Sequence, residues 1–346
     1  MSAQDRKNLV TRLTEEVVTE DELEEILDTK ENPTAYIGYA PTGTPHIGHF
    51  ATIRKVADFV KAGFEFKVLI ADIHAELDVE KTPIDLVDAR SEVYEEAIKE
   101  MIKQSGVDLD DVDFVRGSDF QHDKEYQKGY MQLMENATLN RAQRASSEVV
   151  RHEEGMKSSG VLYPFLQIMD CVGLDVDVAY AGTDQRRIYM LGRETLPEIG
   201  EDKITTVLYP LLGGLQGGKM SSSSPKSKIG MLDSNEDIRD KIMDAYCPEG
   251  QAKDNSLLGY VKYLVFPIIE DRGETFDVER PDKYGGDVSY SSYEELEDDF
   301  LSGDLHPQDL KQTAADILEE IIVPVRERLL EKEEVLKRAY PEEFGD

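Results

Sequence analysis

The sequence predicts an α/β protein, in which a doubly wound parallel sheet with a helical insertion is followed by a smaller, mainly α-helical region. Residues 35–40 form an apolar run that stops at Pro and Gly and restarts with helical spacing, which indicates strand, tight loop and helix. Residues 66–73 form a second, nearly continuous apolar run, as expected for a parallel strand buried on both faces. Strand and helix patterns then alternate along much of the chain, which favours a parallel sheet.

The helix after the first loop begins with the motif His46-Ile47-Gly48-His49. Two imidazoles therefore lie on one face of a helix N-terminus, where unpaired backbone N–H groups and the helix dipole favour a phosphate. Gly48 leaves room for a nucleotide base against the backbone. The motif predicts a nucleotide or anion site, although an ordinary strand-to-helix crossover with two surface histidines has the same pattern. The apolar stripe that places this helix against the sheet comprises Ile47, Phe50, Ile53, Val56 and Phe59.

Residues 213–225 combine a glycine-rich turn, a lysine and a run of hydroxyl side chains. Such a loop can close over a polyphosphate and bring one lysine ammonium and several hydroxyl donors to it. The alternative is a plain Gly/Ser linker, which would not need Lys-Met in its middle. With the histidine motif, this stretch resembles the paired signatures of class I aminoacyl-tRNA synthetases. The resemblance implies a Rossmann-like domain, catalytic roles for His46, His49 and Lys219, and ATP as co-substrate. The implied ATP-binding residues are Gly48, Asp184, Met220, Ser221, Ser222 and Ser223.

The chain of 346 residues is strongly acidic, with 72 Asp and Glu against 39 Lys and Arg and a formal charge of −33. Such a charge normally argues against nucleic acid binding, which needs local positive potential. Recurring apolar periodicity excludes disorder as the explanation. We therefore expect adaptation to high salt, where screening reduces self-repulsion and an acidic surface aids solubility. This hypothesis points to a halophilic source.

The two cysteines, Cys171 and Cys247, are isolated and lack metal-ligand spacing, so neither a disulfide scaffold nor a bound structural metal is expected. No signal peptide and no run long enough to span a bilayer is present. We expect a cytoplasmic protein without membrane partners.

The pattern divides the chain into N-terminal helices at 1–33, a Rossmann-like catalytic domain at 34–230 and an α-helical anticodon-recognition domain at 231–346. Thr19 is expected to cap the second N-terminal helix. Residues 118–158 interrupt the strand–helix alternation and are expected to form a helical insertion. Its arginines are either a solvated face or a place where tRNA or a second subunit docks. They are Arg141, Arg144 and Arg151.

Two polar positions follow the apolar run 66–73. Asp72 and His74 are pocket candidates, because the carboxyl ends of strands line the ligand crevice of an open α/β sheet. A hydrogen bond from His74 to a neighbouring loop is the other interpretation.

The helix at 162–172 is apolar nearly all round, yet Tyr163, Gln167 and Asp170 form one polar stripe along it. A buried carboxylate and amide are costly unless they are paired, so either the fold or a bound ligand satisfies them. Further on, the segment 182–187 begins the helix after a strand, which places Asp184 and Gln185 at the same crevice.

These positions resemble the amino-acid pocket of tyrosyl-tRNA synthetases of the archaeal and eukaryal kind. The resemblance implies that Tyr36 and Asp170 hold the phenol of L-tyrosine. It implies that the ammonium and carboxylate end of the substrate is held by Tyr163, Gln167 and Gln185.

The C-terminal region contains Tyr284 followed by two glycines, and His306-Pro307 followed by Asp309. By resemblance, these aromatic, imidazole and carboxylate groups hold the first anticodon base, and stacking plus edge hydrogen bonds suit that task. A turn and a helix cap at His306 is the alternative. The full implied set of tRNA-binding residues is Arg144, Arg186, Tyr284, His306 and Asp309.

The sequence therefore predicts an ATP-dependent tyrosine–tRNA ligase that forms tyrosyl-adenylate and transfers tyrosine to the 3′ end of tRNA(Tyr). Mg²⁺ is expected at the leaving phosphates, and the family implies a homodimer through the insertion. One departure is Ser222, where the class-wide loop has a second lysine. This leaves open whether Lys226, Lys228 or a potassium ion supplies the missing charge.

Three alternatives remain at this stage: a tryptophanyl-tRNA synthetase, a small nucleotidyltransferase of the same superfamily, and a non-catalytic RNA-binding relative. An indole has no acidic phenol for Asp170 to engage, and a nucleotidyltransferase leaves Tyr284 and His306 unexplained. Intact His46, His49 and Lys219 argue against the non-catalytic relative.

Overall fold

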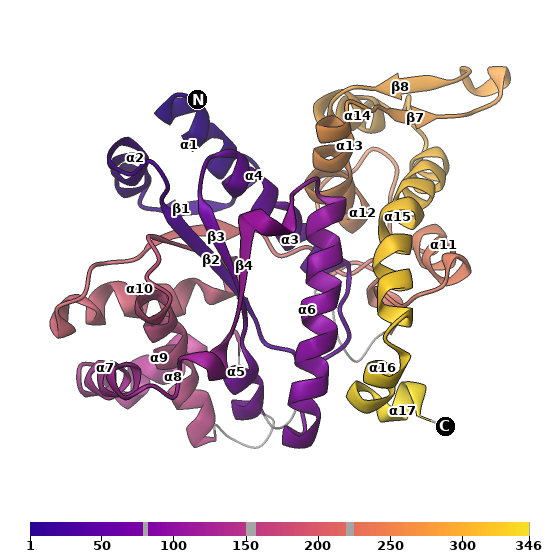
Figure 1. The fold of residues 1–346 in the computed structure, drawn as a ribbon. Coiled ribbons are helices and arrows are strands. Elements are labelled where there is room, and N and C mark those ends of the chain that lie inside the picture. The colour runs from indigo at the N-terminus through magenta and orange to yellow at the C-terminus, as the bar shows by residue number, and fades with distance from the viewer. Residues whose placement is uncertain (79–81, 150–156, 219–224, 346) are drawn as a thin grey trace.

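The computed structural model describes residues 1–78, 82–149, 157–218 and 225–345 (Figure 1). A six-stranded sheet forms its centre, in the order β1-β6-β5-β2-β3-β4. Neighbouring strands from β6 to β4 run parallel, and β1 pairs antiparallel with β6 at the edge. The strands are β1 (Glu16–Val18), β2 (Thr34–Tyr39), β3 (Glu65–Ile70), β4 (Val112–Arg116), β5 (Val178–Gly182) and β6 (Thr205–Tyr209).

Helices cover both faces of the sheet, and alternate strand residues enter two different apolar clusters. Ala35 and Ile37 join one cluster while Tyr36, between them, joins the other. One face packs against α3 (Ile47–Arg54), α4 (Val56–Lys61) and α6 (Val87–Gln104). The other packs against α7 (Lys124–Glu135), α8 (Leu139–Ser146), α9 (Ser158–Gly173) and α10 (Arg186–Thr195). The two-sided burial confirms the doubly wound prediction.

The strand order reverses at β2, which has β3 and β4 on one side and β5 and β6 on the other. At such a switch point the connections leave in opposite directions, so a crevice opens outside the carboxyl ends of β2 and β5. The loop to α3 follows β2, and the 3₁₀ turn η4 (Thr183–Gln185) follows β5. Both predicted ligand-binding segments therefore reach one crevice.

The apolar stripe after the first loop is buried as predicted, but it spans two helices rather than one. α3 ends at Arg54 and α4 begins at Val56, with Lys55 between them. Thr19 caps α2 (Glu20–Thr29) as expected, accepting a hydrogen bond from the Glu22 N–H group.

Two helices of the C-terminal region, α15 and α16, pack against α6 (Figure 1). Part of its core lies in the same apolar cluster as α3 and α4. Its helices are α11 (Asn235–Met243), α12 (Ser256–Tyr260), α13 (Phe266–Arg272), α14 (Tyr293–Ser302), α15 (Pro307–Leu330), α16 (Glu333–Ala339) and α17 (Pro341–Phe344), with one π-helical turn, Val261–Val265. Among the described residues, no helix is both long and apolar enough to cross a membrane.

Three details of the predicted organisation need correction. The stretch 1–33 contains α1 (Ala3–Thr11) and α2, but also β1, so it contributes an edge strand to the sheet. The mainly helical C-terminal region includes a hairpin of β7 (Phe276–Val278) and β8 (Val288–Tyr290). The run 66–73 is not all strand, because β3 ends at Ile70 and α5 (Asp72–Leu77) begins two residues later.

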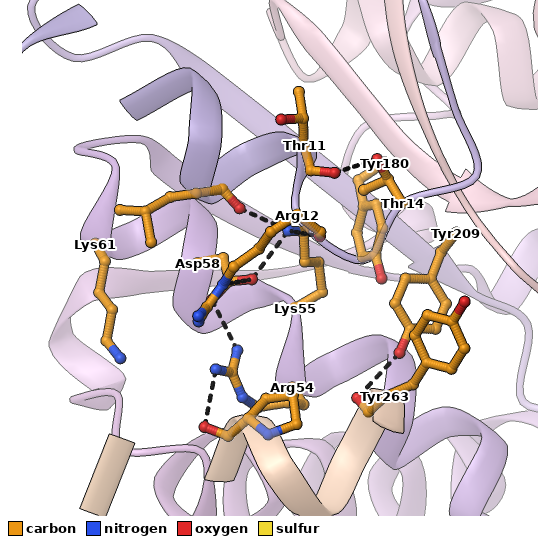
Figure 2. A network of polar contacts seen from close by, with 12 residues as sticks. Thr11, Arg12, Thr14, Arg54, Lys55, Asp58, Lys61, Tyr180, Tyr209 and Tyr263 are labelled. Atoms are coloured by element: carbon orange, nitrogen blue, oxygen red, sulfur yellow. Dashed lines mark hydrogen bonds and ion pairs between the residues drawn. The ribbon is translucent and has the colours of Figure 1, made fainter. Parts of the chain in front are cut away.

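A buried cluster of charges holds the junction of α3 and α4. Figure 2 shows Arg12, Arg54 and Lys55 converging on the carboxylate of Asp58. Arg54 Nη1 and Lys55 Nζ each lie 2.9 Å from Asp58, and Arg12 Nε lies 3.0 Å away. Lys55 Nζ also donates to the carbonyls of Leu9 and Arg12, both at 2.6 Å. The cluster thus ties α1 to the helix pair.

The same cluster reaches the C-terminal region through Arg54, which is only 1% exposed. Its Nη2 donates to the Pro267 carbonyl at 3.1 Å and to Asp271 at 2.8 Å. Burial opposes ionisation of Asp58, but the charges of Lys55, Arg12 and Arg54 outweigh it and hold the pKa of this carboxyl well below its usual range.

We expect Asp58→Asn to destabilise the protein by about 3–5 kcal/mol, because it leaves buried cations without their shared partner. Asp88→Asn is the matched control, since it removes the same charge from an 86% exposed side chain paired with Arg116. The control should cost no more than about 1 kcal/mol. Denaturant unfolding at molar KCl measures both free energies. Equal losses in the two variants would contradict this view of the cluster.

Candidate functional site

A cavity of about 900 Å³ lies at the carboxyl ends of β2 and β5. It is large enough for a nucleotide or an amino-acid adenylate. All of the described residues that the sequence analysis assigned to catalysis, ATP and tyrosine line it. They are Tyr36, His46, Gly48, His49, Tyr163, Gln167, Asp170, Asp184 and Gln185.

One end of the cavity holds the two histidines of the first motif. His46 is the N-cap of α3, and its Nδ1 accepts a hydrogen bond from the Gly48 N–H group at 3.2 Å. The His46 N–H group in turn donates to His49 Nδ1 at 3.1 Å. Because Nδ1 accepts in both rings, the proton of each neutral imidazole resides on Nε2.

Both imidazoles are neutral near physiological pH. Burial, the neighbouring ring and Lys228 hold the pKa of His46 well below its usual range. Burial and Lys228 lower the pKa of His49 to about 4. The ring centroids lie 4.0 Å apart, so two imidazolium charges would repel each other strongly. The pair therefore presents two neutral N–H donors rather than two positive charges.

Backbone pairing joins this motif to the segment that follows the lysine loop. The Ile47 N–H group donates to the Ile229 carbonyl, and the Met231 N–H group donates to the Pro45 carbonyl, both at 2.9 Å. Lys228 consequently lines the cavity, whereas Lys226 is exposed. The predicted loop residues Lys219, Met220, Ser221, Ser222 and Ser223 lie outside the described residues, as does Arg151 of the insertion.

The other end of the cavity is built on α9, whose predicted polar stripe lines it. Asp170 is 1% exposed and its Oδ1 accepts hydrogen bonds from Gln121 Nε2 at 2.6 Å and Tyr126 hydroxyl at 2.8 Å. Burial raises the pKa of Asp170 to about 7, although these two hydrogen bonds oppose the rise. The fold thus satisfies one carboxylate oxygen, and no described residue donates a hydrogen bond to Oδ2.

His74 lies beside that second oxygen, with Nε2 3.7 Å from Asp170 Oδ2. Its ring meets Tyr163 edge to face, and neither ring nitrogen has a hydrogen-bond partner among the described residues. Burial lowers the pKa of His74 to about 4. The prediction that His74 faces the pocket is confirmed. Asp72 turns elsewhere, because it accepts hydrogen bonds from the backbone and hydroxyl of Ser118.

Tyr36 reaches the pocket from β2. Its hydroxyl lies 3.0 Å from the Tyr189 hydroxyl and donates to the Gln167 carbonyl at 3.3 Å. Gln167 Nε2 also donates to the Tyr189 hydroxyl at 3.1 Å. Tyr189, from α10, therefore joins the strand wall to the helix wall.

The arginines assigned to tRNA are exposed and already have protein contacts. Arg186 makes two hydrogen bonds to Glu16, at 2.6 and 2.7 Å, and Arg144 Nε donates to the Asn140 carbonyl at 3.3 Å. Arg144 borders a shallow depression on α8 that the neighbouring Arg187 also approaches, through a 3.0 Å hydrogen bond to Ser147. The two assigned arginines lie outside the cavity.

The C-terminal candidates gather at the end of the β7–β8 hairpin. Tyr284 is 63% exposed in the hairpin loop. His306 is exposed and caps α15, since its Nδ1 accepts from the Gln308 N–H group at 3.1 Å, so the cap interpretation is confirmed. Arg280 links the two segments by donating to the carbonyls of Gly286 and Asp304, both at 2.7 Å.

Sequence reasoning missed four residues that organise these sites. It predicted that a buried Asp170 needs donors, but nothing near Gln121 or Tyr126 in the sequence identifies them as the donors. Tyr189 and Arg280 were not singled out, because no local pattern in the sequence distinguishes them from their neighbours. The first three act through contacts between segments that are far apart in the chain, whereas Arg280 links its own hairpin to Asp304.

A family model described as tRNA synthetases class I (W and Y) matches residues 28–322. The chain is 52% identical to the tyrosine–tRNA ligase of Haloarcula marismortui, covering 100% of this chain and 99% of that protein. This chain belongs to the tyrosyl-tRNA synthetases of class I. The tyrosine–tRNA ligase of Natronomonas pharaonis is also 52% identical, over 99% of this chain and 100% of that protein.

A solved structure agrees with this family assignment. The tyrosyl-tRNA synthetase of Archaeoglobus fulgidus, complexed with L-tyrosine, superposes with a TM-score of 0.89 at 41% identity, covering 95% of this chain and 100% of that one. The synthetase is of the archaeal and eukaryal type, and a tryptophanyl enzyme is not favoured. Its two relatives from halophilic archaea fit the acidic composition.

The pKa of Asp170 gives a test of the site geometry through stability. Because burial raises this pKa from 3.8 to about 7, the folded state binds the proton more tightly than the unfolded state. The contribution of this group to stability is therefore greatest at low pH and is lost as pH rises through that interval, at up to about 1.4 kcal/mol per pH unit. Between pH 4 and 8, the unfolding free energy of the parent should therefore fall relative to that of Asp170→Asn.

In Tyr126→Phe, the loss of stability that accompanies ionisation of Asp170 should extend to higher pH, because this change removes a hydrogen bond that favours the carboxylate. Tyr130→Phe, the same change on the same helix, should leave the profile unaltered. A parent profile identical to that of Asp170→Asn would show that the carboxyl group does not titrate in this interval.

Proposed function

We propose that the cavity carries out tyrosine activation, in which tyrosine and ATP form tyrosyl-adenylate, and that the protein then transfers tyrosine to the 3′ end of tRNA(Tyr). The observation that supports this proposal is that the two ends of one cavity carry different chemical groups. One end presents neutral imidazole donors at a helix N-terminus, and the other presents a buried carboxylate with one oxygen unused. A nucleotide and an amino acid with a hydrogen-bonding side chain fit these ends.

At the amino-acid end, Asp170 would accept the phenol proton of tyrosine at Oδ2, and Tyr36 would hold the phenol from the facing strand. Tyr163, Gln167 and Gln185 would hold the ammonium and carboxylate. The geometry supports this division, because Gln121 and Tyr126 occupy only Oδ1 of Asp170.

At the nucleotide end, the tyrosine carboxylate attacks the α-phosphorus of ATP and pyrophosphate leaves. A carboxylate is ionised at neutral pH, so no general base is required, and catalysis consists of positioning and charge stabilisation. His46 and His49 would donate their Nε2–H groups to phosphate oxygens, and Gly48 and Asp184 would contact the rest of ATP. Lys219 and the residues from Met220 to Ser223 are assigned by motif alone.

Mg²⁺ fits this site as an ion that arrives with ATP. No group of three His, Cys, Asp or Glu side chains in the described part of the chain is arranged to hold a metal. Mg²⁺ commonly binds through substrate phosphates with few protein ligands, and Asp184 is a carboxylate in the cavity. When bound, the ion would neutralise charge on the phosphates.

We assign tRNA recognition to the hairpin end and the exposed arginines. Tyr284 is exposed, with Lys283 Nζ 4.5 Å from its ring centroid, and would stack on a base, while Asp309 and His306 lie on the first turn and cap of α15. Arg144 and Arg186 would contact tRNA nearer the cavity. A homodimer through the insertion is supported by the exposed apolar side chains of Met131 and Leu139.

The decisive experiment is tyrosine-dependent exchange of pyrophosphate into ATP, measured across amino acids at molar KCl. We expect exchange with tyrosine and none above background with tryptophan, since the site has a carboxylate placed for a phenol. Charging of tRNA(Tyr) provides the second readout. Exchange with tryptophan instead, or tRNA binding without exchange, would support one of the alternatives.

We expect Tyr36→Phe to reduce the preference for tyrosine over phenylalanine by about 0.5–1.5 kcal/mol, the worth of one neutral hydrogen bond. Asp170→Asn should cost more, because a charged acceptor is lost and a competing donor enters. The strong discrimination between these substrates by tyrosyl enzymes is a known property of the class. Ratios of kcat/KM in the exchange assay measure the effect.

The control for Tyr36→Phe and Asp170→Asn is Tyr293→Phe, which removes the hydroxyl of a buried tyrosine on α14 in the C-terminal region. It should leave discrimination unaltered. If Tyr36→Phe and Asp170→Asn discriminate as well as the parent, the pocket does not bind the phenol.

A further inference from the structure

Lys228 is a cation held beside the histidine pair by backbone structure. It begins the segment that pairs with the first loop, where Gly230 bridges His46. Ile229 and Met231 of this segment are fully buried. Because side chains alternate along extended backbone, Lys228 points to the opposite side, where it lines the cavity.

The ammonium group of Lys228 has no hydrogen bond and no ion pair with any residue that the structure describes. Its neighbour Lys241 illustrates the contrast, because Lys241 Nζ lies 2.5 Å from Asp233. An unpaired, partly buried cation is unusual in a chain with 72 acidic residues. Burial lowers the pKa of Lys228, and Lys241 adds to this effect, whereas Glu343 and Asp233 oppose it. The charge is kept at an energetic cost, which a bound anion would offset.

The field of Lys228 acts on both imidazoles of the site. It contributes to the lowered pKa of His46 and of His49, which places its charge at the same corner of the cavity. The corner therefore combines two neutral N–H donors, the N-terminus of α3 and one unpaired positive charge. This set matches a polyphosphate, which offers several oxygens and several negative charges.

We propose that Lys228 is a phosphate-binding residue that holds the polyphosphate of ATP against the His46–His49 pair. This inference rests on the proposed function and deepens it. Since backbone pairing fixes the segment before ATP arrives, the cation is preorganised, and its contribution appears already when ATP binds. The fixed cation also answers the question raised by Ser222, because a second lysine outside the loop supplies positive charge.

The test is Lys228→Met in the tyrosine-dependent exchange assay with ATP varied at saturating tyrosine. We expect kcat/KM for ATP to fall about 10- to 100-fold, mainly through a higher KM, as for loss of a charge-assisted hydrogen bond made in the ground state. Lys226→Met is the matched control, because it removes an exposed lysine two residues earlier. It should stay within about twofold of the parent, and Lys228→Arg should retain most of the activity.

Two further measurements separate phosphate binding from a structural role. The affinity for tyrosine, measured by equilibrium dialysis, should be unaffected by Lys228→Met. The pKa of His49, followed by NMR of its ring protons, should rise, because a neighbouring positive charge is gone. Lys228→Gln, which keeps the polar character, should reproduce both results if the methionine variant is poorly folded.

The outcomes are distinguishable. An unchanged KM for ATP in both neutral variants would overturn the inference while leaving the proposed function intact. Absence of tyrosine-dependent exchange in the parent would instead overturn the proposed function. In that case, equilibrium dialysis with ATP alone still tests Lys228, since the neutral variants should bind ATP more weakly and equal binding would refute the inference.

Discussion

The short backbone pairing between residues 45–47 and 229–231 is the constraint on which the site depends. Two hydrogen bonds of 2.9 Å join segments that are more than 180 residues apart in sequence, and the sheet reversal at β2 makes their approach possible. Through this contact the cap of α3 and the segment after the lysine loop become one surface. The backbone position of His46 and that of Lys228 follow from it, whereas the tautomers of the two imidazoles follow from hydrogen bonds within the histidine motif. Separation of the two segments would move the histidine donors away from Lys228 and would also expose the buried Ile229 and Met231.

Buried ionisable groups in this acidic protein are stabilised in two different ways. Beneath α3 and α4, three basic groups surround Asp58, so every charge has an opposite partner close by. Within the cavity, burial instead favours neutral forms, because His46, His49 and His74 have lowered pKa values and that of Asp170 is raised. The paired charges around Asp58 stabilise the scaffold. In the cavity, the neutral histidines and Asp170, whose pKa lies near neutrality, can change their protonation state when a ligand binds. High salt screens the acidic surface far more than either buried set.

Local pattern was sufficient for the elements that bury a continuous stripe or run. The apolar positions from Ile47 to Phe59, the apolar run that contains β3 and the polar stripe on α9 were all predictable, because periodicity directly reports which face is buried. The strands β1, β7 and β8 have three residues each, which is too short for a period to register. The donors to Asp170 were unpredictable for another reason: neither Gln121, before α7, nor Tyr126, on α7, carries a local sequence pattern that identifies its hydrogen bond to α9. His306 shows the converse, since its capping role was visible locally.

The contact of Arg54 with Pro267 and Asp271 bears on how the molecule can be divided. This arginine lies on α3, which begins at the His46–His49 motif, and its buried guanidinium needs acceptors from the C-terminal region in addition to Asp58. Apolar residues from both regions also belong to one cluster. Removing the C-terminal region would therefore expose that cluster to solvent. It would also leave Nη2 of Arg54 without its hydrogen-bond acceptors. We therefore expect the regions on the two sides of residue 230 to unfold together, so that recombination could not exchange either of them on its own.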